Sequence, residues 1–312
     1  MTSPLPPHVL IVDDDPDLCG LLSEYLAANG LDVESAGDGN AMRQAMANRA
    51  PDAVILDLED GTHASRKAAA REGLQVRYHQ LANANKTVAV RVNGDLLTLT
   101  QDLRAAVWPG LDLLVLPKVE HARDVQLIAA AVSTLEAERG LAPDHVRLLL
   151  QIESAVALPR LHDIAAAHPR VMGMMLGSED FSLDLGGLPG EELLLTPSLM
   201  VLHAARAAGV QPIGFVASIA ALGDVESFRR VLERARSLGF RGAVIVHPKF
   251  IDAVNDCYTP SVAQMNEAQV IVDAFDAADR QGLGAVRIGE LMVDKPVYRR
   301  ALQLLADARR VS

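Results

Sequence analysis

The sequence is poor in cysteine, in aromatic residues and in long apolar stretches. Its two cysteines, Cys19 and Cys257, are too few for a disulfide framework and lack the clustering of a structural zinc site, so we expect a reducing, cytoplasmic setting. No segment approaches about 18 consecutive apolar residues, and no basic region followed by an apolar one opens the chain, which argues against a membrane partner and a signal peptide. Aromatic residues make up only 4% of the chain although 50% is hydrophobic, so the core must come from Ala, Val, Leu and Ile, as is typical of helices layered on buried strands.

Basic residues are also fewer than acidic ones. The chain has 29 Lys plus Arg against 40 Asp plus Glu, a formal net charge of −11 with neutral His, which argues against a nucleic-acid partner. A localised pocket for an anionic small molecule remains compatible with this balance. The length of 312 residues fits two domains of about 150 residues, or one α/β barrel of about 250 residues with appendages.

Eight short apolar runs follow one another along the chain, and each ends in polar or charged residues. Because their apolar residues are continuous rather than alternating, they are typical of strands buried on both faces. Helical patterns lie between them, and the clearest covers residues 224–238 and stops before Gly239. The runs cover residues 9–15, 53–60, 87–93, 112–120, 146–153, 171–180, 212–215 and 242–248.

From the second run onward, the runs end at intervals of about 31 residues, the size of one strand–helix unit. Together with the first run this makes eight units, which predicts an α/β fold of the (β/α)8 TIM-barrel class. The first interval is too long for one unit, because it holds an extra strand-like piece at residues 32–36 between two helical stretches. Residues from about 255 onward lie outside the eightfold pattern.

Charged residues gather where these strands end, which is where a barrel of this class places its chemistry. Glu153 and Asp180 follow consecutive strands, so we expect them side by side, where two carboxylates could hold a hard cation. Arg91 could offer two parallel N–H donors to a substrate carboxylate, a geometry that lysine lacks. For any single one of these residues, a solvated strand end is an equally good explanation.

Seven fragments stand in an order and at spacings that a known family shares: DAVILDLEDG, VAVRVNG, LDLLVLPKVE, LLLQIESAVAL, MLGSEDFSLDLGG, GFRGAVIVHPKFIDAVND and GELMVDKPVYRRA. With these fragments, residues 51–305 resemble the citrate lyase β-subunit-like branch of the HpcH/HpaI aldolase superfamily. The resemblance implies a carbon–carbon lyase that depends on Mg²⁺, with Mn²⁺ as the alternative metal. The implied substrate is a β-hydroxyacyl-CoA, such as malyl-CoA or citramalyl-CoA, or a related 2-keto acid aldol.

The resemblance also implies roles for individual residues. Glu153 and Asp180 fall on the family's metal-binding carboxylates, Arg91 on its substrate-carboxylate arginine, and Asp294 on an acidic residue that the family presents from a neighbouring subunit. A homo-oligomer, a trimer or a hexamer, is therefore implied as well. Cleavage next to a thioester leaves an enolate, so such a site must stabilise negative charge on oxygen and manage one proton.

Further residues have weaker assignments. Gly177 and Ser178 would let backbone N–H groups approach a ligand and would complete the substrate-binding set with Arg91 and Glu153. Glu59 and Asp60 either position metal-bound waters or Arg91, or are solvated strand ends. Two alternatives stay open: Glu153 and Arg91 could form a purely structural ion pair, and Asp294 could cap a helix in a tail that folds back on its own barrel.

The front of the chain resembles a different family, the response-regulator receiver domains. In HVLIVDDDPDLCGLLSEYLAANGLDVESAGDG and PDAVILDL, Asp13 and Asp14 would be the acidic pair and Asp57 the phosphorylated residue. The receiver pattern stops after Asp57, so we expect that Asp57 does not accept phosphate. The rival to the lyase hypothesis is a receiver-type signalling protein whose barrel is a degenerate binding module.

These patterns together predict a TIM barrel with a C-terminal helical extension and an atypical receiver-like N-terminal βαβα segment. We expect a flexible N-terminus over residues 1–7 and a receiver-like segment over 8–50 that supplies the first barrel strand. The barrel would occupy residues 51–254, and residues 255–312 would form a helical extension that acts as a lid.

Overall fold

The computed structural model describes residues 8–12, 32–36, 53–82, 87–218, 223–245 and 248–311. The chain divides into two compact units, Met1–Ile251 and Asp252–Ser312. Within the described part, every helix is too short or too polar to span a lipid bilayer.

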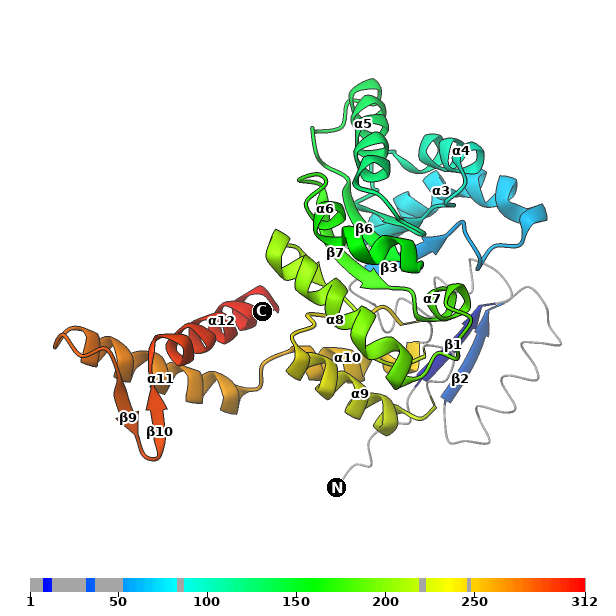
Figure 1. The fold of residues 1–312 in the computed structure, drawn as a ribbon. Helices are drawn as coiled ribbons and strands as arrows, with labels where there is room; N and C mark the ends of the chain where they lie inside the picture. Colours follow the sequence, from blue (N-terminus) through cyan, green and yellow to red (C-terminus); the bar gives the residue numbers. More distant parts are fainter. Residues whose placement is uncertain are drawn as a thin grey trace. The chain divides into compact units, whose positions relative to one another are not determined.

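The larger unit is built on a parallel sheet of six strands that lie in chain order. Parallel neighbours need a crossover connection, and here helices supply most of the crossovers. The α/β class that the sequence predicts is thereby confirmed. The strands are β3 (Ala53–Asp57), β4 (Thr87–Arg91), β5 (Leu113–Leu116), β6 (Arg147–Ile152), β7 (Val171–Leu176) and β8 (Gln211–Pro212). Figure 1 labels three of them, β3, β6 and β7.

Helices pack against one face of this sheet through a large apolar core. Alternate residues of the central strands, such as Val90 in β4 and Leu150 in β6, are fully buried there against helix residues such as Leu74 and Val125. Among its described residues, the α-helices of this unit are α3 (Lys67–Ala82), α4 (Leu96–Ala106), α5 (Ala122–Glu138), α6 (Leu161–Ala165), α7 (Ser178–Asp184), α8 (Glu191–Ala208) and α9 (Val225–Leu238). Three short 3₁₀ turns accompany them, η1 (Ala64–Arg66), η2 (Ala155–Arg160) and η3 (Pro248–Phe250).

The boundaries of α9 show how local sequence fixes an element. The predicted helix over residues 224–238 is confirmed, because α9 covers Val225–Leu238. The Asp224 carboxylate caps its first turn by accepting a hydrogen bond of 2.8 Å from the Ser227 N–H. Gly239 ends the helix with φ of 115°, in the left-handed region where a residue without a side chain is unstrained.

The opposite face of the sheet carries a smaller apolar cluster. It consists of Ala89, Val115, Leu149 and Met175, one residue from each of the four central strands. Since side chains alternate along a strand, Arg91 and Gln151, each two residues further on, belong to this same face. The charged strand ends therefore lie above this inner cluster.

The last predicted strand, residues 242–248, is not assigned as a strand over the residues that can be described. Residues 241–245 nevertheless run beside β8, since the Arg241 N–H donates to the Pro212 carbonyl at 2.9 Å and the Gly214 N–H donates to the Gly242 carbonyl at 2.8 Å. Val244 packs against the inner apolar cluster. Residues 246–247, including His247, lie outside the described part of the chain.

The front of the chain contributes a separate pair of strands. β1 (His8–Val12) pairs in parallel with β2 (Asp32–Ala36), which is the extra strand-like piece that the sequence predicts. Within the described residues, no pairing joins either strand to β3, so the expected role of β1 as a barrel strand remains a prediction. The terminus 1–7, the helical stretches of this segment, and Asp13 and Asp14 lie outside the described residues.

The smaller unit consists mainly of two helices and a hairpin. α10 (Ile251–Tyr258) leads into α11 (Val262–Asp279), a hairpin of β9 (Val286–Ile288) and β10 (Leu291–Val293) follows, and α12 (Lys295–Val311) runs back alongside α11 (Figure 1). Ala268, Val272 and Ala301 are buried between the two long helices. The rings of Phe275 and Tyr298 stack with their centroids 4.6 Å apart.

Candidate active site

Asp57, the last residue of β3, has both carboxylate oxygens engaged. Its Oδ1 accepts hydrogen bonds from Arg91 Nε and from the Glu59 N–H, each at 2.9 Å, and its Oδ2 accepts from Arg91 Nη2 and from the Gly61 N–H, the latter at 3.0 Å. Gly61 has to be glycine, because a Cβ there would lie only 2.4 Å from Asp57 Oδ2. Burial raises the pKa of Asp57, but the hydrogen bonds from Arg91 and the backbone outweigh it and hold the pKa below its ordinary value.

Arg91 lies directly opposite Asp57 in the register of β3 and β4. Besides its two bonds to Asp57, its Nη1 lies 3.1 Å from Glu59 Oε2. Burial lowers the pKa of Arg91, yet the hydrogen bond and charge of Asp57 raise it overall, so the guanidinium stays charged. The structural ion pair between Arg91 and Glu153, left open by the sequence, is not what forms: the partners of Arg91 are Asp57 and Glu59.

Lys118 follows β5 and contacts both Glu59 and Glu153. Its Nζ lies 2.9 Å from Glu59 Oε1, and its backbone N–H donates to Glu153 Oε2 at 2.8 Å. The hydrogen bond with Glu59 raises the pKa of Lys118, and the negative charge of exposed Asp60 adds to that effect. We call Asp57, Glu59, Arg91 and Lys118 the arginine cluster.

Glu153 follows β6 and is almost completely buried, with 3% of its surface exposed. Its Oε1 accepts a hydrogen bond from Gln151 Nε2, while its Oε2 accepts the bond from Lys118. Burial raises the pKa of Glu153 to about 7, and the negative charge of Asp180 contributes to the rise. A buried carboxylate beside a second one is an arrangement that a bound cation would stabilise.

Gly177 makes room for this carboxylate. A Cβ on Gly177 would lie 2.6 Å from Glu153 Cγ and 3.0 Å from Gln151 Nε2. Its own N–H donates to the Ile152 carbonyl at 2.8 Å, so this donor is already engaged within the protein. The contribution of Gly177 in this structure is space, which differs from the expected approach of its N–H to a ligand.

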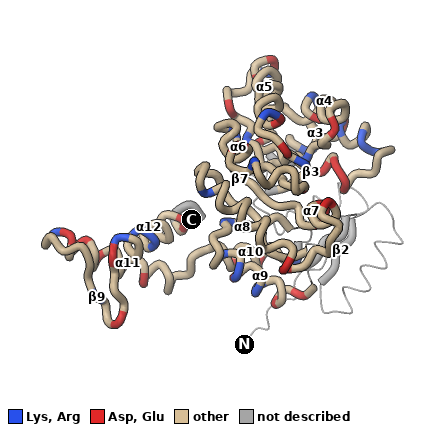
Figure 2. Tube along the Cα trace, in the orientation of Figure 1, with Lys and Arg blue, Asp and Glu red and all other residues tan. Residues whose placement is uncertain are grey.

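Asp180 lies in the first turn of α7, directly after β7, and is half-buried. Ser178 begins the same helix, and its hydroxyl lies 3.4 Å from Glu179 Oε1. We call Glu153 and Asp180 the carboxylate pair. Figure 2 shows acidic residues both after β3 and on α7.

The donor set suits a small hard cation. In the described part of the chain, no group of three or more His, Cys, Asp and Glu residues could enclose a metal, and Mg²⁺ typically binds through only one or two carboxylates and keeps several waters. Gln151 Oε1 and Ser154 Oγ, which flank Glu153 in sequence, are buried without a hydrogen-bond partner and could bind such waters. Four carboxylates of the arginine cluster and the carboxylate pair face two cationic side chains, so the site has an excess of negative charge that a bound cation would offset.

Asp294 belongs to the smaller unit, where its Oδ1 accepts a hydrogen bond of 3.1 Å from the Val297 N–H at the start of α12. It therefore caps α12 within its own chain, while the fold-back of the tail onto its own barrel, the other part of the alternative that the sequence left open, stays a prediction. This contact does not test whether Asp294 also serves a neighbouring subunit.

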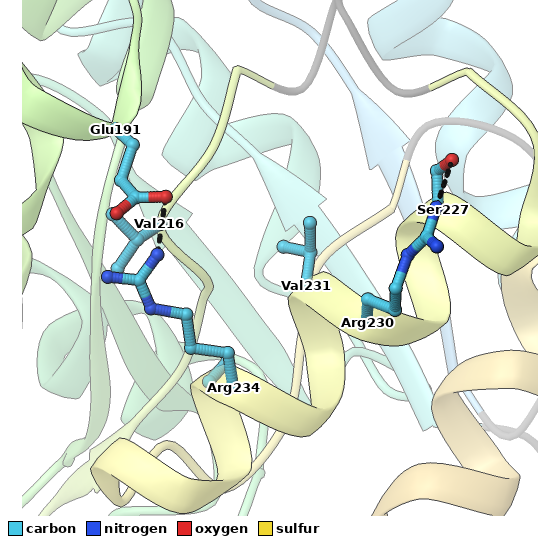
Figure 3. A pocket seen from close by; sticks show the side chains of 7 residues that line it. Glu191, Val216, Ser227, Arg230, Val231 and Arg234 are labelled. Atoms are coloured by element: carbon cyan, nitrogen blue, oxygen red, sulfur yellow. Dashed lines mark hydrogen bonds and ion pairs between the residues drawn. The ribbon is translucent and has the colours of Figure 1, made fainter.

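A pocket of about 270 Å³ lies elsewhere, between the start of α8 and α9 (Figure 3). Its lining includes Arg234, which is paired with Glu191, and Arg230, which lies 3.2 Å from Ser227 Oγ. It contains none of the residues of the arginine cluster or the carboxylate pair. We therefore place the candidate active site at the strand ends, where the buried charges are.

From the sequence, we placed four of these six residues in the lyase site; Asp57 was considered only as the phosphorylated residue of a receiver domain, and the function of Lys118 was missed. Its place in LPKVE at a strand end was visible in the sequence. Its contacts with Glu59 and Glu153 depend on how three strand ends come together, and a local sequence pattern does not predict such contacts.

Comparison with known proteins identifies the family of the chain. The family model described as HpcH/HpaI aldolase/citrate lyase matches residues 35–248, and the chain belongs to this family. It is accordingly a carbon–carbon lyase, so the enzyme class expected from the sequence is confirmed. The match includes residues 35–58, and no support appears for the receiver resemblance of residues 8–58.

Curated relatives cover most of the chain. Citrate lyase subunit beta of Leuconostoc mesenteroides subsp. cremoris is 32% identical over 81% of this chain and 84% of its own length. L-malyl-CoA/beta-methylmalyl-CoA lyase of Rhodobacter capsulatus is 30% identical over 87% of this chain and 92% of its own. Among solved structures, protein CitE from Mycobacterium tuberculosis in complex with magnesium, acetoacetate and coenzyme A is 27% identical, covers 97% of this chain and 98% of its own, and superposes with a TM-score of 0.62.

Proposed function

We propose that the protein is a Mg²⁺-dependent lyase that cleaves or forms a β-hydroxyacyl-CoA such as malyl-CoA or citramalyl-CoA, or a related 2-keto acid aldol. The observation that carries this proposal is the buried Glu153, held beside Asp180 and next to the arginine cluster. The magnesium, acetoacetate and coenzyme A in the similar CitE structure support it, as does the malyl-CoA lyase among the relatives.

In this proposal, Glu153 and Asp180 hold the cation, with Mn²⁺ as the alternative metal. When bound, the cation would stabilise the negative charge that develops on the enolate oxygen. Gln151 and the Lys118 N–H each donate to one oxygen of Glu153, which fixes the orientation of its carboxylate. Gly177 leaves the space that this orientation requires, and Ser178 lies beside it as an expected part of the substrate-binding set.

Arg91 would bind the substrate carboxylate. A guanidinium has five N–H groups, and the three contacts with Asp57 and Glu59 leave one on each terminal nitrogen. Two such donors can form parallel hydrogen bonds with one carboxylate. Glu59 would thus position Arg91, while Asp60, exposed at the same strand end, would contribute negative charge nearby.

Asp294 would exchange a proton with the substrate carbon in the site of a neighbouring subunit. This requires a homo-oligomer, for which we propose a trimer or a hexamer in the cytoplasm. The experiment mixes the inactive variants Arg91→Ala and Asp294→Ala under conditions of subunit exchange. Partial recovery of activity would support a shared site, whereas a monomer, or an exchanged mixture that stays inactive, would contradict it.

We also propose that the sheet closes into an eight-stranded barrel. The hydrogen bonds of residues 241–245 to the segment around β8, and the packing of Val244 on the inner cluster, support closure on that side. The remaining strand would come from the front segment.

The proposed activity is tested directly with the purified full-length protein. Malyl-CoA and citramalyl-CoA are supplied with Mg²⁺, and the keto acid and acetyl-CoA are measured together with free CoA thiol. The last measurement is needed because a (3S)-malyl-CoA thioesterase of Cereibacter sphaeroides is also 32% identical to the chain. Equal amounts of keto acid and acetyl-CoA, abolished by EDTA, are expected; full activity in EDTA would refute the metal site.

A further inference from the structure

Lys118 contacts both groups of the site, each through a different part of the residue. Its ammonium lies 2.9 Å from Glu59 Oε1, and Glu59 Oε2 lies 3.1 Å from Arg91 Nη1. Its backbone N–H donates to Glu153 Oε2 at 2.8 Å. Lys118 therefore links the other residues of the arginine cluster to the carboxylate pair.

The backbone of Lys118 has an uncommon conformation. Its φ of 54° lies in the left-handed region, where side chains are disfavoured and glycine is not. A glycine could therefore present the same N–H to Glu153 with less strain. The lysine side chain must provide something that the N–H does not, and its ion pair with Glu59 identifies this as positive charge.

The charges of the arginine cluster balance only when Lys118 is included. Asp57 and Glu59 carry two negative charges, and Arg91 and Lys118 carry two positive ones. Without the ammonium, Arg91 would bind an anion from a cluster with one net negative charge. The same ammonium acts in the opposite direction at Glu153, where positive charge competes with a bound cation.

We propose that Lys118 is a positioning residue that sets the balance between the two binding functions of the site, favouring an anion at Arg91 and weakening a cation at Glu153 and Asp180. This rests on the proposed function, and it names the determinant that makes the site accept a carboxylate next to four acidic groups. About half of the Lys118 side chain is exposed, so solvent screens its charge and the expected effects are moderate.

The test compares Lys118→Met, Lys118→Gly and Lys118→Arg in the full-length protein. Mn²⁺ affinity is measured by electron paramagnetic resonance, acetoacetate affinity by calorimetry in the presence of Mn²⁺, and KM and kcat with malyl-CoA. In Lys118→Met we expect acetoacetate to bind about three- to tenfold more weakly, KM to rise more than kcat falls, and Mn²⁺ to bind about two- to threefold more tightly.

The other two variants separate charge from structure. Lys118→Gly keeps the N–H and loses the charge, so it should match Lys118→Met; it also provides the test if the methionine variant fails to fold. Lys118→Arg keeps the charge and should stay close to the wild type in both affinities. General structural damage would weaken both ligands, whereas the proposed balance moves their affinities in opposite directions.

Two results would overturn the inference: weaker binding of both Mn²⁺ and acetoacetate in Lys118→Met and Lys118→Gly, or an unchanged acetoacetate affinity in both. These differ from a failure of the proposed function, which would appear in the wild type as absent Mn²⁺ binding and absent cleavage. If the wild type binds Mn²⁺ but cleaves neither thioester, the two affinities of the variants still decide the role of Lys118.

Discussion

The sheet carries two groups of charged residues with opposite electrostatic character. One lies at the ends of β3 to β5, and the other at the ends of β6 and β7. The arginine cluster at the first three strand ends pairs every carboxylate with a cation. The carboxylate pair at the other two has no cationic side chain in direct contact in the described residues, and Glu153 is bound there only by an amide and a backbone N–H. The difference indicates that the first group is prepared for an anion and the second for a cation.

The largest effect is expected from removing the carboxylate pair. Glu153→Ala or Asp180→Ala should lower kcat/KM by about 10³-fold or more, because the cation and its stabilisation of the enolate are lost together. Mn²⁺ binding should disappear in the same variants. The control is Glu192→Ala, an exposed acidic residue in the first turn of α8, which should leave both unchanged. Normal Mn²⁺ affinity in Glu153→Ala would remove Glu153 from the metal site.

Arg91→Lys should disrupt the arginine cluster while leaving the carboxylate pair intact. Lysine keeps the charge but loses the parallel donors that hold Asp57 and the substrate carboxylate, so kcat/KM should fall by about 100-fold. Mn²⁺ affinity should change little, which sharpens the distinction between the two groups. Arg104→Lys, on exposed α4 surface, is the matched control. If Mn²⁺ binding fell as much as activity, the two groups would not be separable.

A smaller effect is expected at Gly177. An added methyl group would lie 2.6 Å from Glu153 Cγ, so Gly177→Ala should displace the carboxylate and weaken Mn²⁺ binding by about tenfold. Gly73→Ala is the control, because its added methyl would meet no atom closer than 3.6 Å and it lies within α3. Calorimetric titration with Mn²⁺ compares the two. Equal affinities would show that Glu153 can shift without consequence for the cation.

The last prediction is that Asp57 does not incorporate phosphate. Both of its oxygens already accept hydrogen bonds from Arg91 and the backbone, so acetyl phosphate should not label the protein. Mass spectrometry after incubation with acetyl phosphate and Mg²⁺ checks this. Stable incorporation that Asp57→Asn abolishes would revive the signalling hypothesis and show that the arginine cluster opens.

The sequence predicted the parts of this arrangement that depend on position along a strand. Glu59, Arg91 and Glu153 follow buried apolar runs at regular intervals, and that spacing was enough to place them at one edge of a parallel sheet. The spacing could not predict which side chains at neighbouring strand ends contact one another. The positive φ of Lys118 and the space that Gly177 leaves for Glu153 arise from tertiary packing, which local sequence does not predict.

The strict chain order of the six strands has a consequence for how the sequence can vary. Because each strand pairs with its successor, the residues of the arginine cluster and the carboxylate pair all fall between residues 57 and 180, and their hydrogen bonds stay within that stretch. One continuous stretch of sequence therefore supplies both the arginine cluster and the carboxylate pair. A change in the sequence before β3 would thus remove none of these contacts, whatever its effect on the rest of the barrel.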